Sequence, residues 1–157
     1  MKIITIDNKE YKIEYSFEAA EYKELVQRVF KRISGFDIFG RAKDMERPTT
    51  NEIIQGRLDM FSDTPELCKI MFYGGLMENN RVPYDEASAL MKKYMKENKL
   101  SYQKVFEELE TCMEDDGFFD LSGISELLKS IEQASKEITE KMPKVPQDHK
   151  KKQTGTK

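Results

Sequence analysis

The chain has 157 residues, a length that suits one domain, because two separate cores would each be too small to offset the entropy of ordering them. Charged residues make up 35% of the chain and hydrophobic residues 38%, so we expect a modest core and a strongly hydrated surface. The formal net charge of −3 provides no field that attracts a polyanion, which disfavours a general nucleic-acid binder.

Neither a membrane span nor a secreted product is expected. No stretch approaches the roughly 20 apolar residues that cross a bilayer, and the first apolar run is too short for a signal peptide. We therefore expect a cytoplasmic protein. The two cysteines, Cys68 and Cys112, have no metal-ligand spacing and occupy apolar positions of predicted helices, so we interpret them as reduced core thiols.

Residues 2–16 predict a β-hairpin. Two runs rich in β-branched and aromatic residues, 2–6 and 11–16, flank Asp7-Asn8-Lys9-Glu10, where Asp and Asn tolerate the backbone angles of a tight turn. Two strands alone are marginal in water, so we expect helices to cover their apolar face. That face comprises Ile4, Ile6, Tyr11 and Ile13.

A helix is predicted directly after the hairpin, with Ser16 as its N-cap and Gly35 at its end. The following residues, 34–47, combine glycines and charges with large apolar side chains, which predicts a loop carrying an apolar cluster. The predicted helix repeats apolar residues at spacings of three and four: Tyr22, Leu25, Val26, Val29, Phe30 and Ile33. The apolar cluster of the predicted loop consists of Phe36, Ile38 and Phe39.

Two helix-start signals lie between residues 49 and 65. Thr49 and Glu52 predict a capping box ahead of a short helix. Thr64 followed by Pro65 predicts a second start, because the missing N–H of proline costs nothing at the first helical position. This second helix is apolar nearly all round and is therefore predicted to be central; it carries Leu67, Cys68, Ile70, Met71, Phe72 and Leu76.

Three more helices are predicted towards the C-terminus. Amphipathic patterns over residues 84–97 and 101–113 indicate a helical hairpin joined by Asn98-Lys99-Leu100. A last helix, residues 120–142, carries nearly a heptad ladder and could dock on the domain or on another chain. Its ladder consists of Leu121, Ile124, Leu128, Ile131 and Ile138.

These elements predict an α+β fold that is predominantly α-helical. We expect an N-terminal β-hairpin packed on a bundle of about five to six helices, in a single domain over residues 1–142. Residues 143–157 contain two prolines, a lysine run and little that is apolar, so we expect a disordered, Lys-rich tail.

The residues that would carry catalysis are missing from the sequence. The single histidine, His149, lies in the predicted tail, and no nucleophile can be paired with a base. Gly74-Gly75 lies within a helix pattern and suits close helix packing better than a phosphate loop. Asp115-Asp116-Gly117 with Asp120 lacks the offsets of a calcium loop. We therefore expect no enzymatic activity, no cofactor and no metal.

Several short motifs recur in a recognisable order along the chain. An aromatic-Gly-Gly-Leu helix end is followed by an acidic helix start with alanine, and later by a small-Gly-Phe-Phe segment. These are Tyr73-Gly74-Gly75-Leu76-Met77, Val82-Pro83-Tyr84-Asp85-Glu86-Ala87 and Asp116-Gly117-Phe118-Phe119. Together with the opening strand-turn-strand, this order resembles tail assembly chaperones of siphophages and of prophages of Gram-positive bacteria, over nearly the whole chain up to Met142.

The resemblance implies a protein that binds the tape measure protein, recruits tail tube subunits, and is absent from the mature virion. It would act in the host cytoplasm, and it could also form a homo-oligomer. A transient chaperone needs apolar surface that a partner covers and later releases. The candidate contact residues are Phe36, Ile38, Phe39, Phe118 and Phe119; for the last two, a core position beneath loops is an equally good interpretation.

Three other classes of function stay open. The chain could be a helical, phage-encoded adaptor or regulator that binds a host protein, and its partner would distinguish this from a chaperone. An enzyme whose site forms only in an oligomer would have to work with carboxylates alone. A DNA-binding helical protein would need a basic recognition helix, and the lysines at 92, 93 and 96 have acidic neighbours that offset them.

Overall fold

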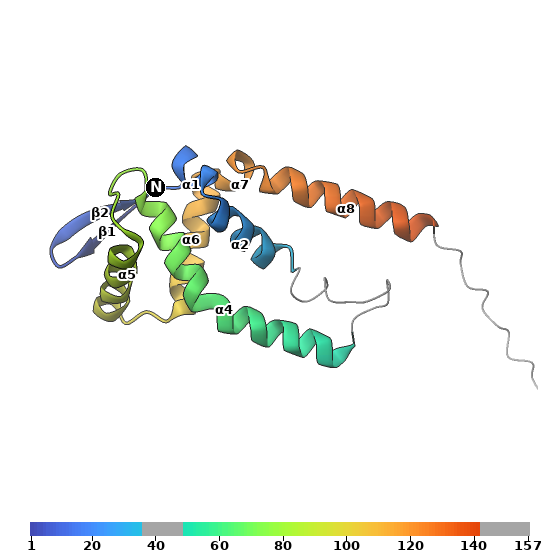
Figure 1. The fold of residues 1–157 in the computed structure, drawn as a ribbon, viewed down its shortest axis with the longest axis horizontal. Coiled ribbons are helices and arrows are strands. Elements are labelled where there is room, and N and C mark those ends of the chain that lie inside the picture. Colours follow the sequence, from blue (N-terminus) through green and yellow to red (C-terminus); the bar gives the residue numbers. More distant parts are fainter. Residues whose placement is uncertain (36–48, 142–157) are drawn as a thin grey trace, which may run out of the picture.

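The computed structural model describes residues 1–35 and 49–141. The predicted loop cluster of Phe36, Ile38 and Phe39, the tail and His149 lie outside the described residues. An N-terminal two-stranded hairpin is followed by helices only, so the predicted α+β, predominantly helical fold is confirmed (Figure 1). In chain order the elements are β1 (Lys2–Ile6), β2 (Lys9–Ile13), α1 (Phe17–Glu21), α2 (Lys23–Ile33), α4 (Thr50–Leu76), α5 (Tyr84–Asn98), α6 (Tyr102–Asp115), α7 (Phe118–Leu121) and α8 (Ile124–Lys141).

The hairpin pairs β1 and β2 antiparallel, with Lys2 opposite Ile13 and Ile6 opposite Lys9. Its turn is shorter than predicted, because only Asp7 and Asn8 leave the ladder. Both have positive φ, 51° and 60°, which is the two-residue turn whose twist matches that of the strands. The predicted apolar face is confirmed, since all four of its side chains are buried: Ile4, Ile6, Tyr11 and Ile13.

The single helix predicted after the hairpin is wrong in one respect: it is two helices. Tyr22 takes an extended conformation between α1 and α2, with ψ at 91°, and its ring packs edge-to-face on Tyr73 with centroids 5.5 Å apart. Ser16 stands at the N-cap position without a capping bond; its hydroxyl instead donates to a Glu78 carboxylate oxygen at 2.5 Å. Gly35, with φ at 66°, ends the pair as predicted.

The prediction of two helices between residues 49 and 76 is also wrong, because α4 runs unbroken through Pro65. The capping box of Thr49 and Glu52 is confirmed. Proline inside a helix removes one backbone bond and pushes against the preceding turn, and Figure 1 shows α4 changing direction between its teal first half and its green second half. The carbonyl oxygen of Met60, at the bend, accepts from Arg32 Nη1 at 2.7 Å and from Thr64 Oγ1 at 3.0 Å.

The second half of α4 is the centre of the core, as predicted. Gly74 and Gly75 allow this packing, since a Cβ at either position would lie 2.6 Å from a carbon of Leu25 or Ile13. The Gly75 carbonyl also accepts a bond from the Glu14 amide at 2.9 Å. Close packing is thus the structural reason for the glycine pair. The buried residues of the hairpin and helices form one cluster around this half of α4.

Helices α5 and α6 follow the predicted ranges, but the predicted hairpin between them is wrong as a packing unit. Each packs mainly on α4. A hydrogen bond from Tyr94 Oη to Glu108 Oε2, 2.8 Å long, links the two helices, and Lys2 Nζ donates to the same carboxylate oxygen at 2.7 Å. The large apolar surface of α4 therefore organises both helices.

The predicted last helix is likewise divided. Gly123, with φ at 77°, separates the short α7 from α8, which packs mainly against α7. Figure 1 shows α8 and the first half of α4 extending away from the rest of the ribbon. We refer to these two segments as the α8 arm and the α4 arm. Among the described residues, none of the helices combines the length and apolarity that a bilayer crossing requires.

Candidate protein-interaction surface

The α4 arm exposes a row of large apolar side chains. Ile54 is 51% exposed, Leu58 54% and Phe61 71%. Their spacings of four and three place them on one face of the helix, and Pro65, half-buried, continues the row by a further four. Single exposed apolar residues are ordinary, whereas a contiguous row marks an interaction site. We call these four residues the α4 seam.

The arm is apolar on two sides. Gly56 is buried, and Ile53 and Met60 are half-buried, on the side of the helix opposite the seam. An amphipathic surface helix needs only one apolar stripe to join its core. The seam is therefore surplus to the packing of the arm, and it is available to another molecule.

A groove lies at the end of the seam, where α4 bends. Its volume is about 410 Å³ and its walls are mainly apolar, formed by Phe61, Thr64, Pro65, Ser101, Tyr102 and Gln103. Residues of α4 at the bend line one side of the groove, and the start of α6 lines the other. There the Ser101 hydroxyl caps α6 by accepting from the Lys104 amide at 3.3 Å. A groove of this size can hold an apolar side chain of a partner.

Charge near the seam is carried by Arg57. It is exposed and lines a second hollow of about 260 Å³ together with Arg32, Met60 and Phe61. Arg32 is occupied, because it donates to the Met60 carbonyl and its guanidinium lies 4.9 Å from the centre of the Phe106 ring. Arg57, in contrast, has no ion pair within the part of the chain that the structure describes. The seam thus suits an apolar partner with a carboxylate beside it.

A second exposed row lies on the α8 arm. Leu127 is 47% exposed and Ile131 is 45% exposed, and they are four residues apart on one face. Ile124 is buried and Leu128 half-buried against the core, so the first turns of α8 are attached while the adjacent face stays open. We call Leu127 and Ile131 the α8 seam.

Phe118 and Phe119, two of the predicted contact residues, have core-directed positions. Phe118 is fully buried, with its ring centroid 5.7 Å from that of Tyr15 and 5.9 Å from that of Phe119. Phe119 is half-buried against the same core. Neither side chain is presented to a partner as Ile54 or Phe61 is. Phe36, Ile38 and Phe39 lie outside the described residues.

Sequence reasoning missed the α4 seam, because it predicted only a short helix after the capping box and assigned no binding role to Ile54, Leu58 and Phe61. A usable signal was present. Ile53, Gly56 and Met60 form a second stripe on the opposite face, and a helix that packs on one side only cannot bury both.

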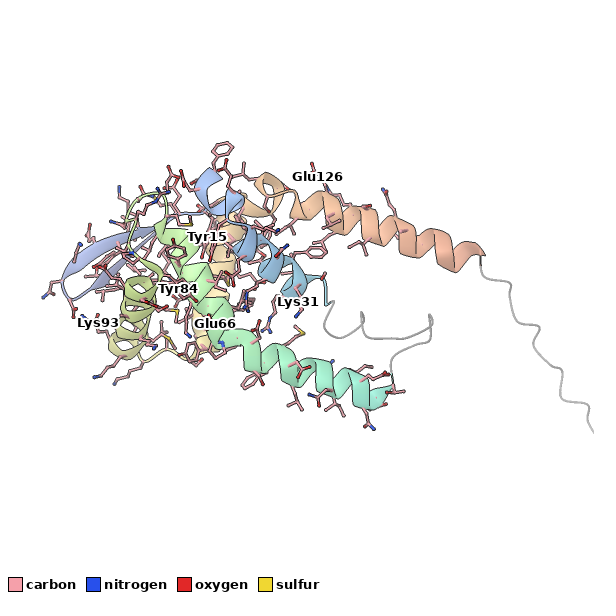
Figure 2. The ribbon with its side chains drawn as sticks, in the orientation of Figure 1. Tyr15, Lys31, Glu66, Tyr84, Lys93 and Glu126 are labelled. Carbon is pink, nitrogen blue, oxygen red and sulfur yellow. The ribbon has the colours of Figure 1, made fainter. Side chains whose placement is uncertain are left out.

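A polar cluster around Glu66 has a structural role. Tyr84 Oη donates to Glu66 Oε1 at 2.8 Å, which joins α5 to α4; Figure 2 shows the two residues close together. Lys69 Nζ, also on α4, donates to Glu66 Oε2 at 2.7 Å. The bond from Lys69, and then that from Tyr84, lower the pKa of the Glu66 carboxyl. Burial, and then the bond to Glu66, raise the pKa of Tyr84.

The two cysteines are free and buried, so the prediction of core thiols is confirmed. Burial raises the pKa of the Cys68 thiol to about 12, which keeps it protonated and unreactive at neutral pH. Within residues 1–35 and 49–141, no group of three or more histidine, cysteine or acidic side chains is placed to hold a metal ion.

Comparison with known proteins gives no match: no protein-family model fits the chain, and neither a curated protein nor a solved structure is significantly similar to it. The motif order in the sequence and the exposed apolar seams are therefore the features that bear on function.

Proposed function

We propose that the chain is a tail assembly chaperone, which binds the tape measure protein of a long-tailed phage and recruits tail tube subunits while the tail is built. Two independent features support this proposal. The order of the motifs along the chain resembles that family, and the α4 seam provides the kind of surface that a transient chaperone needs. The α4 seam is the observation that carries the argument.

The seam suits a helical partner. Its residues follow the alternating spacing of four and three that lets two helices interlock side chains along a shared seam. Arg57 stands beside the seam, where a glutamate or aspartate of the partner would face it. A tape measure protein, being long and helical, offers such a stripe many times, so many copies of the chaperone could coat one molecule.

The size of the contact fits release as well as binding. The seam has three strongly exposed side chains and one groove, far fewer than a permanent interface buries. Phe61 borders the groove and would be the residue that contributes most, because aromatic side chains at the centre of a contact usually dominate affinity. When a modest contact is repeated many times along a long partner, the copies together bind firmly. Each single contact is still weak enough to be displaced when tube subunits compete for the same surface.

The proposal is tested by co-expressing the tagged chain with the products of its neighbouring genes and identifying what co-purifies. We expect a tail tube subunit and a long helical tape measure protein. Phe61→Ser should greatly reduce capture. Phe17→Ser is the matched control, because Phe17, on α1, is 70% exposed against 71% for Phe61 and lies away from the seam; capture should persist.

Two outcomes would contradict this proposal. Recovery of a host protein alone, without tail components, would favour an adaptor or regulator instead. Equal loss of capture in Phe61→Ser and Phe17→Ser would show that general surface hydrophobicity, and not the α4 seam, retains the partner.

A further inference from the structure

Two hollows of different chemistry adjoin the α4 seam, and Phe61 lines both of them. The first is the apolar groove between the bend of α4 and the start of α6, with a volume of about 410 Å³. The second, of about 260 Å³, is lined by Arg32, Arg57, Met60 and Phe61, and we call it the cationic hollow. A molecule that lies along α4 across Phe61 therefore meets an apolar site and a cationic site in succession.

The two hollows are offset by about one helical turn. On α4, the groove is lined from Phe61 to Pro65, and the cationic hollow from Arg57 to Phe61. Four residues of α-helix rise by about 6 Å, which is also the distance between side chains three or four positions apart on another helix. One turn of a partner helix that packs along α4 therefore spans both hollows.

The charges of the α4 arm are arranged around the seam unevenly. At about 100° per residue, Arg57 borders one flank of the seam, the other flank is uncharged, and the acidic side chains lie on the opposite face of the helix. The uncharged flank consists of Asn51, Gln55 and Ser62, and the acidic residues are Glu52, Asp59 and Asp63. Arg57 is thus the one charged residue beside the seam between Thr50 and Pro65.

The other charges near the two hollows have partners within the chain. Thr49 binds Glu52, and Gln55 binds Asp59. The ion pairs join Arg28 to Asp63, Lys69 to Glu66, and Lys104 to Glu107. Arg57 has no ion pair within the residues that the structure describes, so its charge is the one available to a partner.

Arg32 supplies the cationic hollow with a second, fixed positive charge. Its Nη1 donates to the Met60 carbonyl at 2.7 Å, and its guanidinium lies 4.9 Å from the centre of the Phe106 ring. These contacts hold the side chain of Arg32 in place, and the guanidinium has further N–H donors. An anion beside Arg57 therefore enters a hollow whose second cation is already in position.

This arrangement selects among occupants. A membrane surface favours a helix with a broad basic face, whereas a single cation borders the seam. A purely apolar helix would fill the groove but would place Arg57 at the edge of the contact without a counter-ion. A helix that carries one carboxylate beside its apolar stripe satisfies both the groove and Arg57.

We propose that the α4 seam recognises an amphipathic helix in which a large apolar side chain and a carboxylate lie one turn apart, three or four residues in sequence. The apolar side chain fills the groove beside Phe61, and the carboxylate accepts hydrogen bonds from Arg57 in the cationic hollow. This inference rests on the proposed function only in taking the α4 seam as the partner-binding surface. It adds the sequence pattern that a partner must carry.

The probe is a synthetic helical peptide with leucines at alternating spacings of four and three, a glutamate on each flank of the leucine stripe, and alanine and glutamine elsewhere. Calorimetry measures its binding to the full chain at low salt. Replacing both glutamates with glutamine should weaken binding about fivefold, as expected for one exposed ion pair. Moving the glutamates to the face opposite the leucines should weaken it as much, although the net charge of the peptide is unchanged.

Exchange of the charges is the sharper test. The Arg57→Glu chain should bind the glutamate peptide more weakly than the wild type does, and it should bind a peptide with lysines in place of the glutamates more tightly. A folding defect would not produce this gain of affinity. Lys12→Glu is the matched control, because Lys12 is an exposed cation on β2 and Figure 1 shows the hairpin and the α4 arm at opposite ends of the ribbon. This control should keep the preference for glutamate.

Three results would overturn the proposal. The first is equal affinity for the glutamate, glutamine and opposite-face peptides. The second is an Arg57→Glu chain that shows no exchange of preference. The third is self-association of the free chain that Phe61→Ser abolishes, because a second copy would then occupy the α4 seam.

Co-expression with the neighbouring gene products separates this inference from the proposed function. If the wild-type and Arg57→Glu chains capture the tape measure protein equally well, the inference fails and the proposed function stands. If the peptides show the glutamate preference and the charge exchange but no tail component co-purifies with the wild type, the inference stands and the proposed function fails.

Discussion

The two halves of α4 belong to one unbroken helix, yet they have opposite surroundings. Its second half carries Leu67, Ile70 and Phe72, each no more than 1% exposed, at the centre of the core. Its first half exposes Ile54, Leu58 and Phe61 to more than half of their full extent. The second half is the more apolar of the two, but the first half also carries large apolar side chains that the core does not bury, so the presence of apolar residues alone does not decide burial. What differs is how many elements pack around each half: the hairpin and several helices surround the second half, whereas in the first half, within the described residues, α2 binds only near the bend, at Met60 and Asp63.

The difference assigns separate roles to the two halves. A side chain that fills the core contributes to stability, and its removal leaves a cavity. A side chain on the seam contributes little to stability and is available for binding. The predictions below test this division by changing residues in the body and in the arms.

The largest expected effect comes from truncating a buried aromatic residue. Phe118→Ala should lower the free energy of unfolding by about 3–5 kcal/mol, because it leaves a cavity against Tyr15. Phe61→Ala should change it by no more than about 0.5 kcal/mol. Urea denaturation of both variants measures the difference. A large loss in Phe61→Ala would show that the α4 seam belongs to the core.

Gly75→Ala should have an intermediate effect. The added Cβ would lie 2.6 Å from Ile13 Cγ2 and 3.3 Å from Tyr15 Cζ. Overpacking of this kind costs about 1–3 kcal/mol, from which roughly 1 kcal/mol is recovered through the better helix propensity of alanine. The free energy of unfolding should therefore fall slightly or moderately. An increase would mean that β2 can move away from α4 without cost.

Thr49→Ala should act only locally. Loss of the capping box removes the bond from the Glu52 amide to Thr49 Oγ1, and an N-cap is worth about 1 kcal/mol to its helix. Because the α4 arm packs less than the body, we expect faster amide exchange in the first turns of α4 and an unchanged midpoint of global unfolding. A shifted midpoint would show that the arm unfolds together with the body.

The smallest effect concerns acid stability. The pKa of Glu66 is lowered below its ordinary value of 4.5, by the bond from Lys69 first and that from Tyr84 second. A lowered carboxyl pKa stabilises the fold above the unfolded-state pKa, and this contribution disappears as the pH falls through the folded-state value. Glu66→Gln should thus flatten part of the stability loss below pH 4.5. An unchanged dependence of stability on acid pH would show that groups other than Glu66 cause the loss of stability.

Sequence reasoning reached most of the body because local chemistry determines it there. Alternating residues predict the hairpin, and three-and-four spacing predicts α5 and α6. It failed where tertiary packing overrode a local signal. Thr64 and Pro65 look like a helix start, but Arg32 and Thr64 bind the Met60 carbonyl and the helix continues. Tyr22 has no helix-breaking chemistry, and its extended backbone accompanies packing on Tyr73.

The interaction surface was harder to predict than the fold. An apolar stripe at helical spacing reads the same whether it faces a core or a partner. Whether such a stripe is buried depends on how many other elements can cover it, and that number follows from the arrangement of the helices and strands in space. Phe118 and Ile54 illustrate this difficulty: Phe118, for which the sequence left a partner contact and a core position open, is buried, while Ile54, to which no binding role was assigned, is exposed.

Hydrogen–deuterium exchange of the chain, alone and with a co-purified tape measure protein, tests the central claim most directly. In the free chain, residues 66–76 should be strongly protected and residues 50–61 weakly. Binding should slow exchange in residues 50–61 and at the start of α6, beside the groove, and leave the core unchanged. Protection confined to other segments, with residues 50–61 unaffected, would contradict the assignment of the α4 seam as the partner-binding surface.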